Sequence, residues 1–518
     1  MAVTVAGKNY TQLSSCDASS SGGTWSGVTF TQDADTKKEG SYALSCILKT
    51  SGDNTVTFTP TASVNLLNKH LRMWILLTHG GLLNTYTNGG IQFFVTGGGN
   101  TGYWKVAGKV SAGETQIYPG GWYNMVIDTS LACDSGTKPT DMTAITALGF
   151  RINLTAAGKN AVNTWFDNLI VSDGLVCSGD DAGGYFDFDD IWTTDGEISG
   201  VIRKIGGQYF STGMFEYGDS AANNATKFQA KSQVLVFENR RVLSTLYALN
   251  VVDYGGSNAT EFILGSKSGT AGIEGCNIRT QDSSQTPKFS VDGVTDTDVD
   301  NFKIYGTTFF DAAVTKFPPN ATNVEVLNSS WEKCGTVEVN TAVTKYCNFV
   351  SSDDDAIKLP ATNNTTDCSF ISCVNAIEIY QANDYTFSNF TFTNNTYDVN
   401  NTSGGTRTVS KTNGSNPTSY TGSTVNFTAS FSLTLTDIVE GTQVTIVNSS
   451  TRTELHNVTI GGTGSTSYTH SGGETVDILI VHLDYDPNAS SIYSLLLPNS
   501  SSTIKIQQSD DGNYDNPA

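Results

Sequence analysis

The sequence predicts an all-β protein with three successive parts: a β-sandwich, a right-handed parallel β-helix and a second, smaller β-sandwich. Charged residues make up 15% of the 518 residues, against about 25% in typical soluble domains. The Glu, Lys and Arg that normally cover helical surfaces are therefore scarce. Short runs alternate apolar and polar residues, and one pattern recurs at intervals of about twenty residues. Alternation predicts sandwich strands, and the repeat predicts stacked coils.

The charge balance excludes two classes of partner. The chain carries 29 basic and 50 acidic residues, a formal net charge of -21. Nucleic acids and anionic membrane surfaces attract the opposite sign of charge, so neither is expected as a partner. No apolar run approaches the roughly 20 residues that span a bilayer as a helix.

The N-terminus and the cysteines indicate either a chain that is made and kept in a cytoplasm or one that leaves by a route that needs no signal peptide. Residues 1–12 contain one Lys and lack the apolar segment of a signal peptide, so we do not expect them to act as one. The nine cysteines are an odd number, without CxxC pairs or Cys/His zinc spacing. We expect buried, reduced thiols that pack as small apolar residues.

Residues 1–174 are expected to form the first domain. Val56 and Phe58 alternate with threonines, and Ile91, Phe93 and Val95 repeat the same spacing. Glycine pairs punctuate these runs and indicate turns. Short alternating strands at regular spacing predict a β-sandwich.

Three stretches of this region resemble strands of jelly-roll carbohydrate-binding modules. They are residues 38–44 (KEGSYAL), 121–128 (GWYNMVID), and 146–150 with 165–171 (TALGF and WFDNLIV). The resemblance covers about 170 residues and implies a jelly roll with a structural calcium ligand at Asp167. Tyr103 and Trp104 are candidates for stacking on sugars, because an aromatic ring has an apolar face. The alternative for both is packing in the core.

Residues 175–405 carry the repeat and are expected to form the β-helix. An apolar–charged–apolar core recurs in each copy, with an aromatic residue ahead of it. The cores are 336–339, 356–359, 376–379 and 396–399, and the aromatics are Trp331, Phe349, Phe370 and Phe392. Repeats of this length that contain only strands stack as coils. Cys347 and Cys368 hold equivalent positions, so we expect them in an inner ladder.

Two further segments complete the chain. Residues 406–424 are mostly Ser, Thr, Gly and Asn, and predict an exposed linker. Residues 425–518 are expected to form a small immunoglobulin-like β-sandwich, because apolar residues alternate without a break from Val425 to Leu435.

Asp353, Asp354 and Asp355 are the weak catalytic candidates. They resemble the paired aspartates of polygalacturonase-type glycoside hydrolases, which need one carboxylic acid and one carboxylate. That family also uses a His, and this chain has none between His79 and His456. A lyase would need a basic residue, for which Lys345 and Lys358 are nearby in sequence. The alternative is a solvated turn without activity, and no cofactor is required.

The order of the parts resembles that of bacteriophage appendage proteins, and so does the opening 1–10 (MAVTVAGKNY). The resemblance implies a virion-surface protein that is assembled in the host cytoplasm. It implies a homotrimer that decorates the capsid or forms a fibre, contacts capsid or tail proteins and binds a host-surface glycan. The alternative is a tail spike or secreted polysaccharide-degrading enzyme, a glycoside hydrolase or lyase. A bacterial surface adhesin is a third hypothesis. We expect such a protein to carry an export signal.

Overall fold

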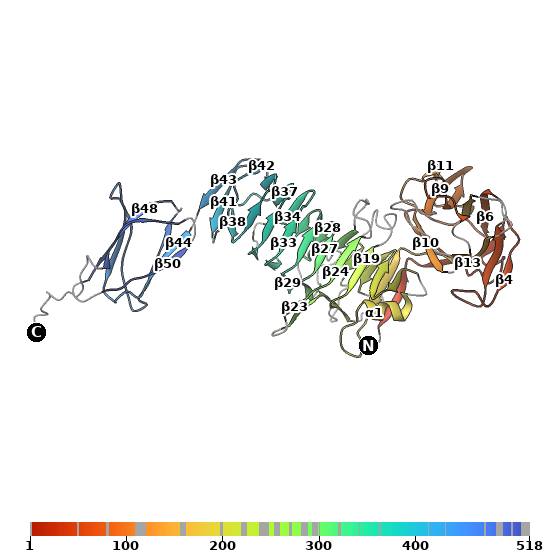
Figure 1. Ribbon diagram of the computed structural model, residues 1–518, viewed down its shortest axis with the longest axis horizontal. Helices are drawn as coiled ribbons and strands as arrows, with labels where there is room; N and C mark the ends of the chain where they lie inside the picture. Colours follow the sequence, from red (N-terminus) through yellow and green to blue (C-terminus); the bar gives the residue numbers. More distant parts are fainter. Residues whose placement is uncertain are drawn as a thin grey trace, which may run out of the picture. The chain divides into compact units, whose positions relative to one another are not determined.

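A computed structural model gives the arrangement of the chain (Figure 1). It describes residues 3–508 except 49–50, 79–81, 109–120, 156–161, 197–199, 219–224, 238–247, 253–259, 269–271, 281–288, 293–298, 300, 320–322, 341, 361, 363, 413, 430, 471–472, 483–489 and 499–500. Strands dominate the described residues, which confirms the all-β class. The chain divides into two compact units, Met1–Glu325 with Trp331–Gly335 and Val326–Ser330 with Thr336–Ala518.

Two six-stranded antiparallel sheets of the first unit share one apolar core, as the sequence predicts for a β-sandwich. Val56 and Phe58 are fully buried in that core, because alternate residues of a strand point to the same face. One sheet has the order β10-β7-β13-β5-β4, with β2 beside β13. The other has the order β11-β9-β8-β12-β6-β3. The strands are β2 (Thr11–Ser14), β3 (Gly23–Ser26), β4 (Thr31–Asp33), β5 (Ala43–Leu48), β6 (Gly52–Pro60), β7 (His70–Leu77), β8 (Ile91–Gly97), β9 (Asn100–Ala107), β10 (Trp122–Asp128), β11 (Ser135–Gly136), β12 (Ala147–Leu154) and β13 (Val162–Val171).

The first strand of the chain does not belong to this sandwich, although the sequence predicts one domain over 1–174. β1 (Thr4–Lys8) pairs in antiparallel fashion with β14 (Gly174–Ser178), which itself pairs in parallel with β17 (Met214–Tyr217). Lys8 Nζ lies 2.7 Å from Glu216 Oε1. β1 thereby covers the open edge at which a parallel stack begins, where unpaired N–H and C=O groups would otherwise face water.

Short strands of the first unit then stack in three parallel sheets. Each turn of the chain adds one strand to each sheet, as in the series β17, β18, β19 and then β20, β21, β24. This is the pairing expected of a parallel β-helix, while its handedness stays a prediction. Phe228, Phe262 and Phe302 stack inside it, with ring centres 5.3 and 5.5 Å apart. The elements are α1 (Phe188–Ile191), η2 (Trp192–Gly196), β15 (Ile202–Ile205), β16 (Gln208–Ser211), β18 (Thr226–Ala230), β19 (Val234–Phe237), β20 (Leu249–Val251), β21 (Thr260–Leu264), β22 (Ser266–Ser268), β23 (Gly272–Glu274), β24 (Asn277–Thr280), β25 (Phe289–Asp292), β26 (Asn301–Tyr305), β27 (Thr308–Phe310) and β28 (Ala312–Lys316).

The second unit contains the repeats that the sequence predicts. Phe349, Phe370 and Phe392 align in register, with successive ring centres 5.1 and 5.2 Å apart. Cys347 and Cys368 are buried at equivalent positions of neighbouring turns, which confirms the inner ladder. The strands, beginning where the chain passes between the units, are β29 (Val324–Leu327), β30 (Ser330–Glu332), β31 (Val337–Glu338), β32 (Val343–Lys345), β33 (Asn348–Val350), β34 (Asp355–Leu359), β35 (Asn364–Thr366), β36 (Ser369–Ile371), β37 (Asn375–Ile379), β38 (Tyr385–Ser388), β39 (Thr391–Thr393) and β40 (Tyr397–Asn401).

The segment 406–424 differs from the predicted linker. It contains β41 (Arg407–Thr412) and β42 (Tyr420–Gly422), which pair in parallel with β38 and β40. β43 (Val425–Ala429) pairs in parallel with β41, so it extends the stack instead of opening the second sandwich. Ser, Thr and Asn are typical of linkers. Their backbone N–H and C=O groups can still pair with a preceding strand whose edge is unpaired.

The last part of the second unit has two small sheets around one apolar core, as predicted for a sandwich. Their orders are β47-β44-β50 and β46-β45-β48-β49. Leu433, Leu435, Val444 and Ile446 are fully buried there. The immunoglobulin-like connectivity stays a prediction. The strands are β44 (Phe431–Thr436), β45 (Gln443–Asn448), β46 (Glu454–Thr459), β47 (Thr466–His470), β48 (Thr475–Val481), β49 (Ile492–Leu496) and β50 (Ser502–Lys505).

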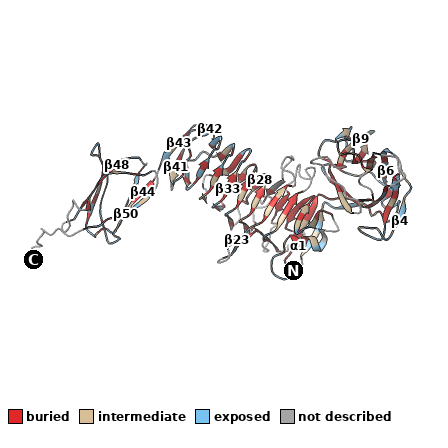
Figure 2. Cartoon of the chain, in the orientation of Figure 1, coloured by how far each residue is buried: buried red, intermediate tan, exposed pale blue. Residues whose placement is uncertain are grey.

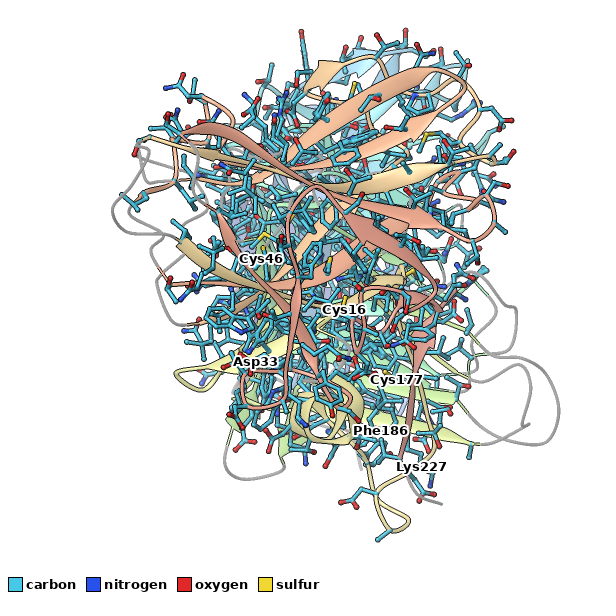
Figure 3. The ribbon with its side chains drawn as sticks, turned by 90° about the vertical axis from the view of Figure 1, so that its right-hand side faces the viewer. Cys16, Asp33, Cys46, Cys177, Phe186 and Lys227 are labelled. Carbon is cyan, nitrogen blue, oxygen red and sulfur yellow. The ribbon has the colours of Figure 1, made fainter. Side chains whose placement is uncertain are left out.

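Burial follows the stacked strands and the two sandwich cores (Figure 2). All nine cysteines are free thiols, and all but the half-buried Cys133 are buried. Three of them, Cys16, Cys46 and Cys177, are marked in Figure 3. Burial raises the pKa of Cys46 to about 12, so this thiol stays protonated and inert, as expected of a packing residue. Among the described residues, no helix has the length and apolar character needed to cross a bilayer.

Candidate functional site

The two candidate sugar-stacking residues lie on opposite faces of β9. Successive side chains of a strand point in opposite directions, so only one of the pair can face a ligand. Trp104 is fully buried in the sandwich core, and its prediction as a glycan contact is wrong. Tyr103 lies on the outer face and is half-buried.

Tyr103 is part of a connected polar surface. The central carbon of the Arg151 guanidinium lies 4.0 Å from the centre of the Tyr103 ring. Arg151 Nε donates a 2.7 Å hydrogen bond to Gln92 Oε1, and its Nη1 lies 3.6 Å from Asp53 Oδ2. A guanidinium stacked on an aromatic ring forms a flat platform that is apolar on its face and polar at its edge.

Asn153 extends this surface across the sheet. Its Nδ2 donates a 2.6 Å hydrogen bond to Asp53 Oδ1, and Asn84 Nδ2 donates one of 3.0 Å to Asn153 Oδ1. We call this surface the tyrosine face. It consists of Asp53, Tyr103, Arg151 and Asn153, from the strands β6, β9 and β12, and the buried Gln92 of β8 accepts a hydrogen bond from Arg151.

Sequence reasoning missed every member of the tyrosine face except Tyr103. One signal was present, since Arg151 is the polar residue between Phe150 and Ile152 in an alternating strand. Alternation places Arg151 on the outer face. It does not show that Gln92 is its cross-strand neighbour, because that pairing joins residues 59 apart in the chain.

Asp167, the predicted calcium ligand, is fully buried in β13. Its Oδ2 accepts hydrogen bonds from the backbone N–H groups of Lys38 (2.7 Å) and Glu39 (2.9 Å). Its Oδ1 is buried without a hydrogen-bond partner among the described residues. Burial raises the pKa of Asp167 to about 6, although the hydrogen bonds from Glu39, Lys38 and Asn168 oppose the shift.

A second carboxylate holds the same loop. Asp17 Oδ1 accepts 2.7 Å hydrogen bonds from the N–H groups of Ser41 and Tyr42. The free oxygen of Asp167 is the kind of ligand that Ca²⁺ prefers, but calcium takes six to eight oxygens. Within the described part of the chain, no three His, Cys, Asp or Glu side chains converge to hold a metal ion. These carboxylates instead fix the backbone of the loop, and calcium at Asp167 stays a prediction.

The three consecutive aspartates have different surroundings. Asp353 and Asp354 are exposed, whereas Asp355 is buried and its Oδ1 accepts a 2.9 Å hydrogen bond from Asn400 Nδ2. Burial raises the pKa of Asp355 above its usual value, and the negative charges of Glu378 and Asp354 raise it further.

Lys358 and Glu378 lie beside Asp355 on the same sheet. Lys358 Nζ is 3.5 Å from Glu378 Oε2 and 4.5 Å from the ring centre of Tyr380. Lys345 belongs to β32, in a different sheet. Glu378 is therefore the carboxylate on a neighbouring coil that raises the pKa of Asp355, and sequence reasoning missed Glu378.

No family model and no curated protein matches the chain. Some solved structures resemble part of it, among them carbohydrate-binding modules and carbohydrate-active enzymes. The CBM22-1 xylan-binding domain from Paenibacillus barcinonensis is 18% identical, with a TM-score of 0.21 over 32% of this chain and 96% of that chain. An exo-β-agarase is 12% identical, with a TM-score of 0.23 over 30% of this chain and 23% of that chain. An endo-β-1,4-glucuronan lyase from the fungus Trichoderma reesei is 10% identical, with a TM-score of 0.18 over 28% of this chain and 86% of that chain.

We expect Asp167 to make stability depend on pH. Its folded pKa of about 6 lies above the 3.8 of a free carboxyl. The protonated Asp167 carboxyl therefore contributes fully to the free energy of unfolding below about pH 4. This contribution is lost as the pH rises through about 6. The loss should be on the order of 1–2 kcal/mol. Chemical unfolding in EDTA at a series of pH values measures it.

The Asp167→Asn variant cannot ionise and should lack this dependence, while Asp141→Asn, at an exposed carboxyl, should retain it. Identical pH profiles for the unmodified protein and Asp167→Asn would contradict the burial argument. A stabilisation by calcium that Asp167→Asn abolishes would show that a cation neutralises this carboxylate.

Proposed function

We propose that the chain is an attachment protein that binds glycans through the tyrosine face. The observation that carries the proposal is the Tyr103–Arg151 platform, which is partly exposed on the outer face of its sheet. Sugars present apolar C–H surfaces that pack on such a platform, and hydroxyls that bond to amides and carboxylates. Asp53 and Asn153 supply those groups at its edge.

We further propose that the protein is a virion appendage that decorates a phage capsid or forms a fibre, and contacts capsid or tail proteins. The support is the order of parts along the chain and its free thiols, which suit assembly in a reducing host cytoplasm. Calcium at Asp167 belongs to this proposal as a stabilising ion only.

Homotrimer formation has support in the second unit. Ile371, Val374 and Tyr397 are 36%, 45% and 39% exposed, which is high for large apolar side chains. Val374 and Tyr397 lie on neighbouring turns, because Tyr397 N donates a 3.0 Å hydrogen bond to Val374 O. Closed rotational symmetry would bury the same stripe on every copy.

Polysaccharide cleavage is the second candidate function, favoured by Asp355 and Glu378. Glycoside hydrolysis needs a carboxyl of raised pKa and a second carboxyl group, and Asp355 meets the first of these needs. Asp355 would donate the proton to the leaving oxygen, and Glu378 would act as the carboxylate.

Removing the tyrosine ring should weaken glycan binding about five- to thirtyfold, because a stacked ring contributes about 1–2 kcal/mol. We expect this loss for Tyr103→Ala in calorimetric titrations with a glycan identified on an array. Tyr493→Ala serves as the control, since Tyr493 is 56% exposed in the second unit. Unchanged affinity in Tyr103→Ala would contradict the proposed face.

Light scattering of the purified protein should give about 166 kDa, three times the chain mass of 55.2 kDa. We expect Val374→Asp to dissociate the trimer, because it places a charge in the apolar stripe. A single-chain mass for the unmodified protein would exclude the trimer.

For the second function, release of reducing ends from host polysaccharides should fall at least a hundredfold in Asp355→Asn, which cannot donate the proton. Asp353→Asn, at an exposed position, should keep full activity. Equal activity of the two variants would rule out Asp355 as the acid, and no release by the unmodified protein would remove this function.

A further inference from the structure

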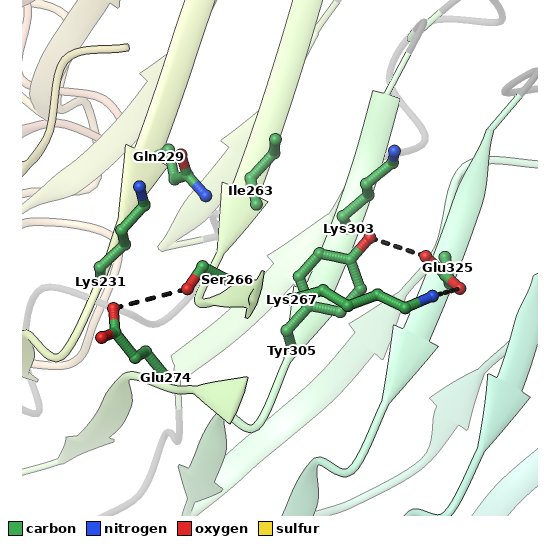
Figure 4. Close-up of a pocket in the computed structure, with 9 residues that line it drawn as sticks. All are labelled: Gln229, Lys231, Ile263, Ser266, Lys267, Glu274, Lys303, Tyr305 and Glu325. Carbon is green, nitrogen blue, oxygen red and sulfur yellow. Dashed lines mark hydrogen bonds and ion pairs between the residues drawn. The ribbon is translucent and has the colours of Figure 1, made fainter. Parts of the chain in front are cut away.

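A groove lies on the outer face of the parallel sheet β18-β21-β26, beside the β22–β23 hairpin (Figure 4). Its volume of about 720 Å³ falls in the range of ligand pockets. Gln229, Ile263 and Lys303 form a row across its floor, since each is in register with the next. Each points outward because its neighbours in the strand are buried in the stack.

One wall of the groove is formed by Glu325 and the two side chains that bond to its carboxylate. Tyr305 Oη donates a 2.7 Å hydrogen bond to Glu325 Oε2, and Lys267 Nζ lies 2.9 Å from Glu325 Oε1. Burial raises the pKa of Glu325, but the bonds from Tyr305 and Lys267 and the charges of Lys267 and Lys303 outweigh it and hold the pKa low. Glu325 is therefore ionised, with both oxygens occupied.

The groove has a surplus of positive charge in an acidic chain. Three lysines line it against two glutamates, whereas the whole chain has 29 basic and 50 acidic residues. Lys267 is paired with Glu325. The ammonium groups of Lys231 and Lys303 form no hydrogen bond or ion pair with any residue that the structure describes.

We propose that this groove binds an acidic oligosaccharide, with two of its carboxylates at Lys231 and Lys303. Lys231 directly follows β18 and Lys303 lies in β26, so their backbones are two strands and two residues apart, or about 12 Å. A glycan with carboxylates on successive sugars can contact both. Between them, Ile263 and the ring of Tyr305 provide an apolar floor for the C–H faces of the sugars. Gln229 and Ser266 offer bonds to hydroxyls.

This site is independent of the tyrosine face, because it consists of other residues on another sheet of the first unit. The test is calorimetric titration of the full chain with hexagalacturonate, at low and at high salt. We expect binding that weakens with salt, since the contacts are ionic. The double variant Lys231→Ala/Lys303→Ala should bind at least tenfold more weakly. Lys505→Ala, at a 78% exposed side chain in the second unit, should bind normally.

Two further ligands and one variant make the outcomes decisive. Cellohexaose, which has no charge, should not compete for the groove. Tyr103→Ala should leave hexagalacturonate binding unchanged, so that failure at one site is distinguishable from failure at the other. No binding of hexagalacturonate at millimolar concentration would overturn the proposal. Equal binding by the folded double variant, or binding of sulfated oligosaccharides alone, would also overturn it.

Discussion

A buried arginine joins the N-terminal sandwich to the first coils, and the arrangement of the first unit depends on it. Arg72 is fully buried in β7. Its Nε donates to Ser172 O (2.6 Å), and its Nη1 and Nη2 donate to Oγ1 and O of Thr212 (2.7 Å each). One guanidinium thus connects a sandwich strand, the end of β13 and the turn after β16. Removing one partner of such a buried charge costs about 3–5 kcal/mol.

The buried charge of Arg72 is stabilised by the nearby carboxylate of Asp173, which in turn lies against the imidazole of His70. Burial lowers the pKa of Arg72 to about 10, while the nearby Asp173 opposes the shift, so the guanidinium stays charged at neutral pH. Asp173 Oδ1 lies 2.9 Å from Nδ1 of His70, whose Nε2 lies 3.7 Å from Asp128 Oδ2. Burial lowers the pKa of His70, but its bonds to both aspartates outweigh that effect and raise it. A network of compensated charges thus joins the sandwich to the first coils.

The tyrosine face and the lysine-lined groove belong to the same compact unit, but they draw on different chemistry. Tyr103 and Arg151 present an amphipathic platform whose positive charge is paired with Asp53, whereas Lys231 and Lys303 present two separated ammonium groups. The two proposals therefore assign different classes of sugar to the two surfaces. The acidic remainder of the surface opposes nonspecific adhesion to anionic material.

The sequence by itself determined the class of every part of the fold that depends on local periodicity. The spacing of Phe349, Phe370 and Phe392 was enough to predict their stack, because equal repeats place equal residues above one another. Only the tertiary structure decided what depends on partners distant in the chain. It assigned β1 to the edge of β14, brought 406–424 into the stack and buried Trp104 instead of Tyr103. It also placed Arg151 beside Gln92 and Asp355 beside Asn400. Alternation shows that neighbouring side chains take opposite faces, but which face is covered depends on the sheet that packs against it.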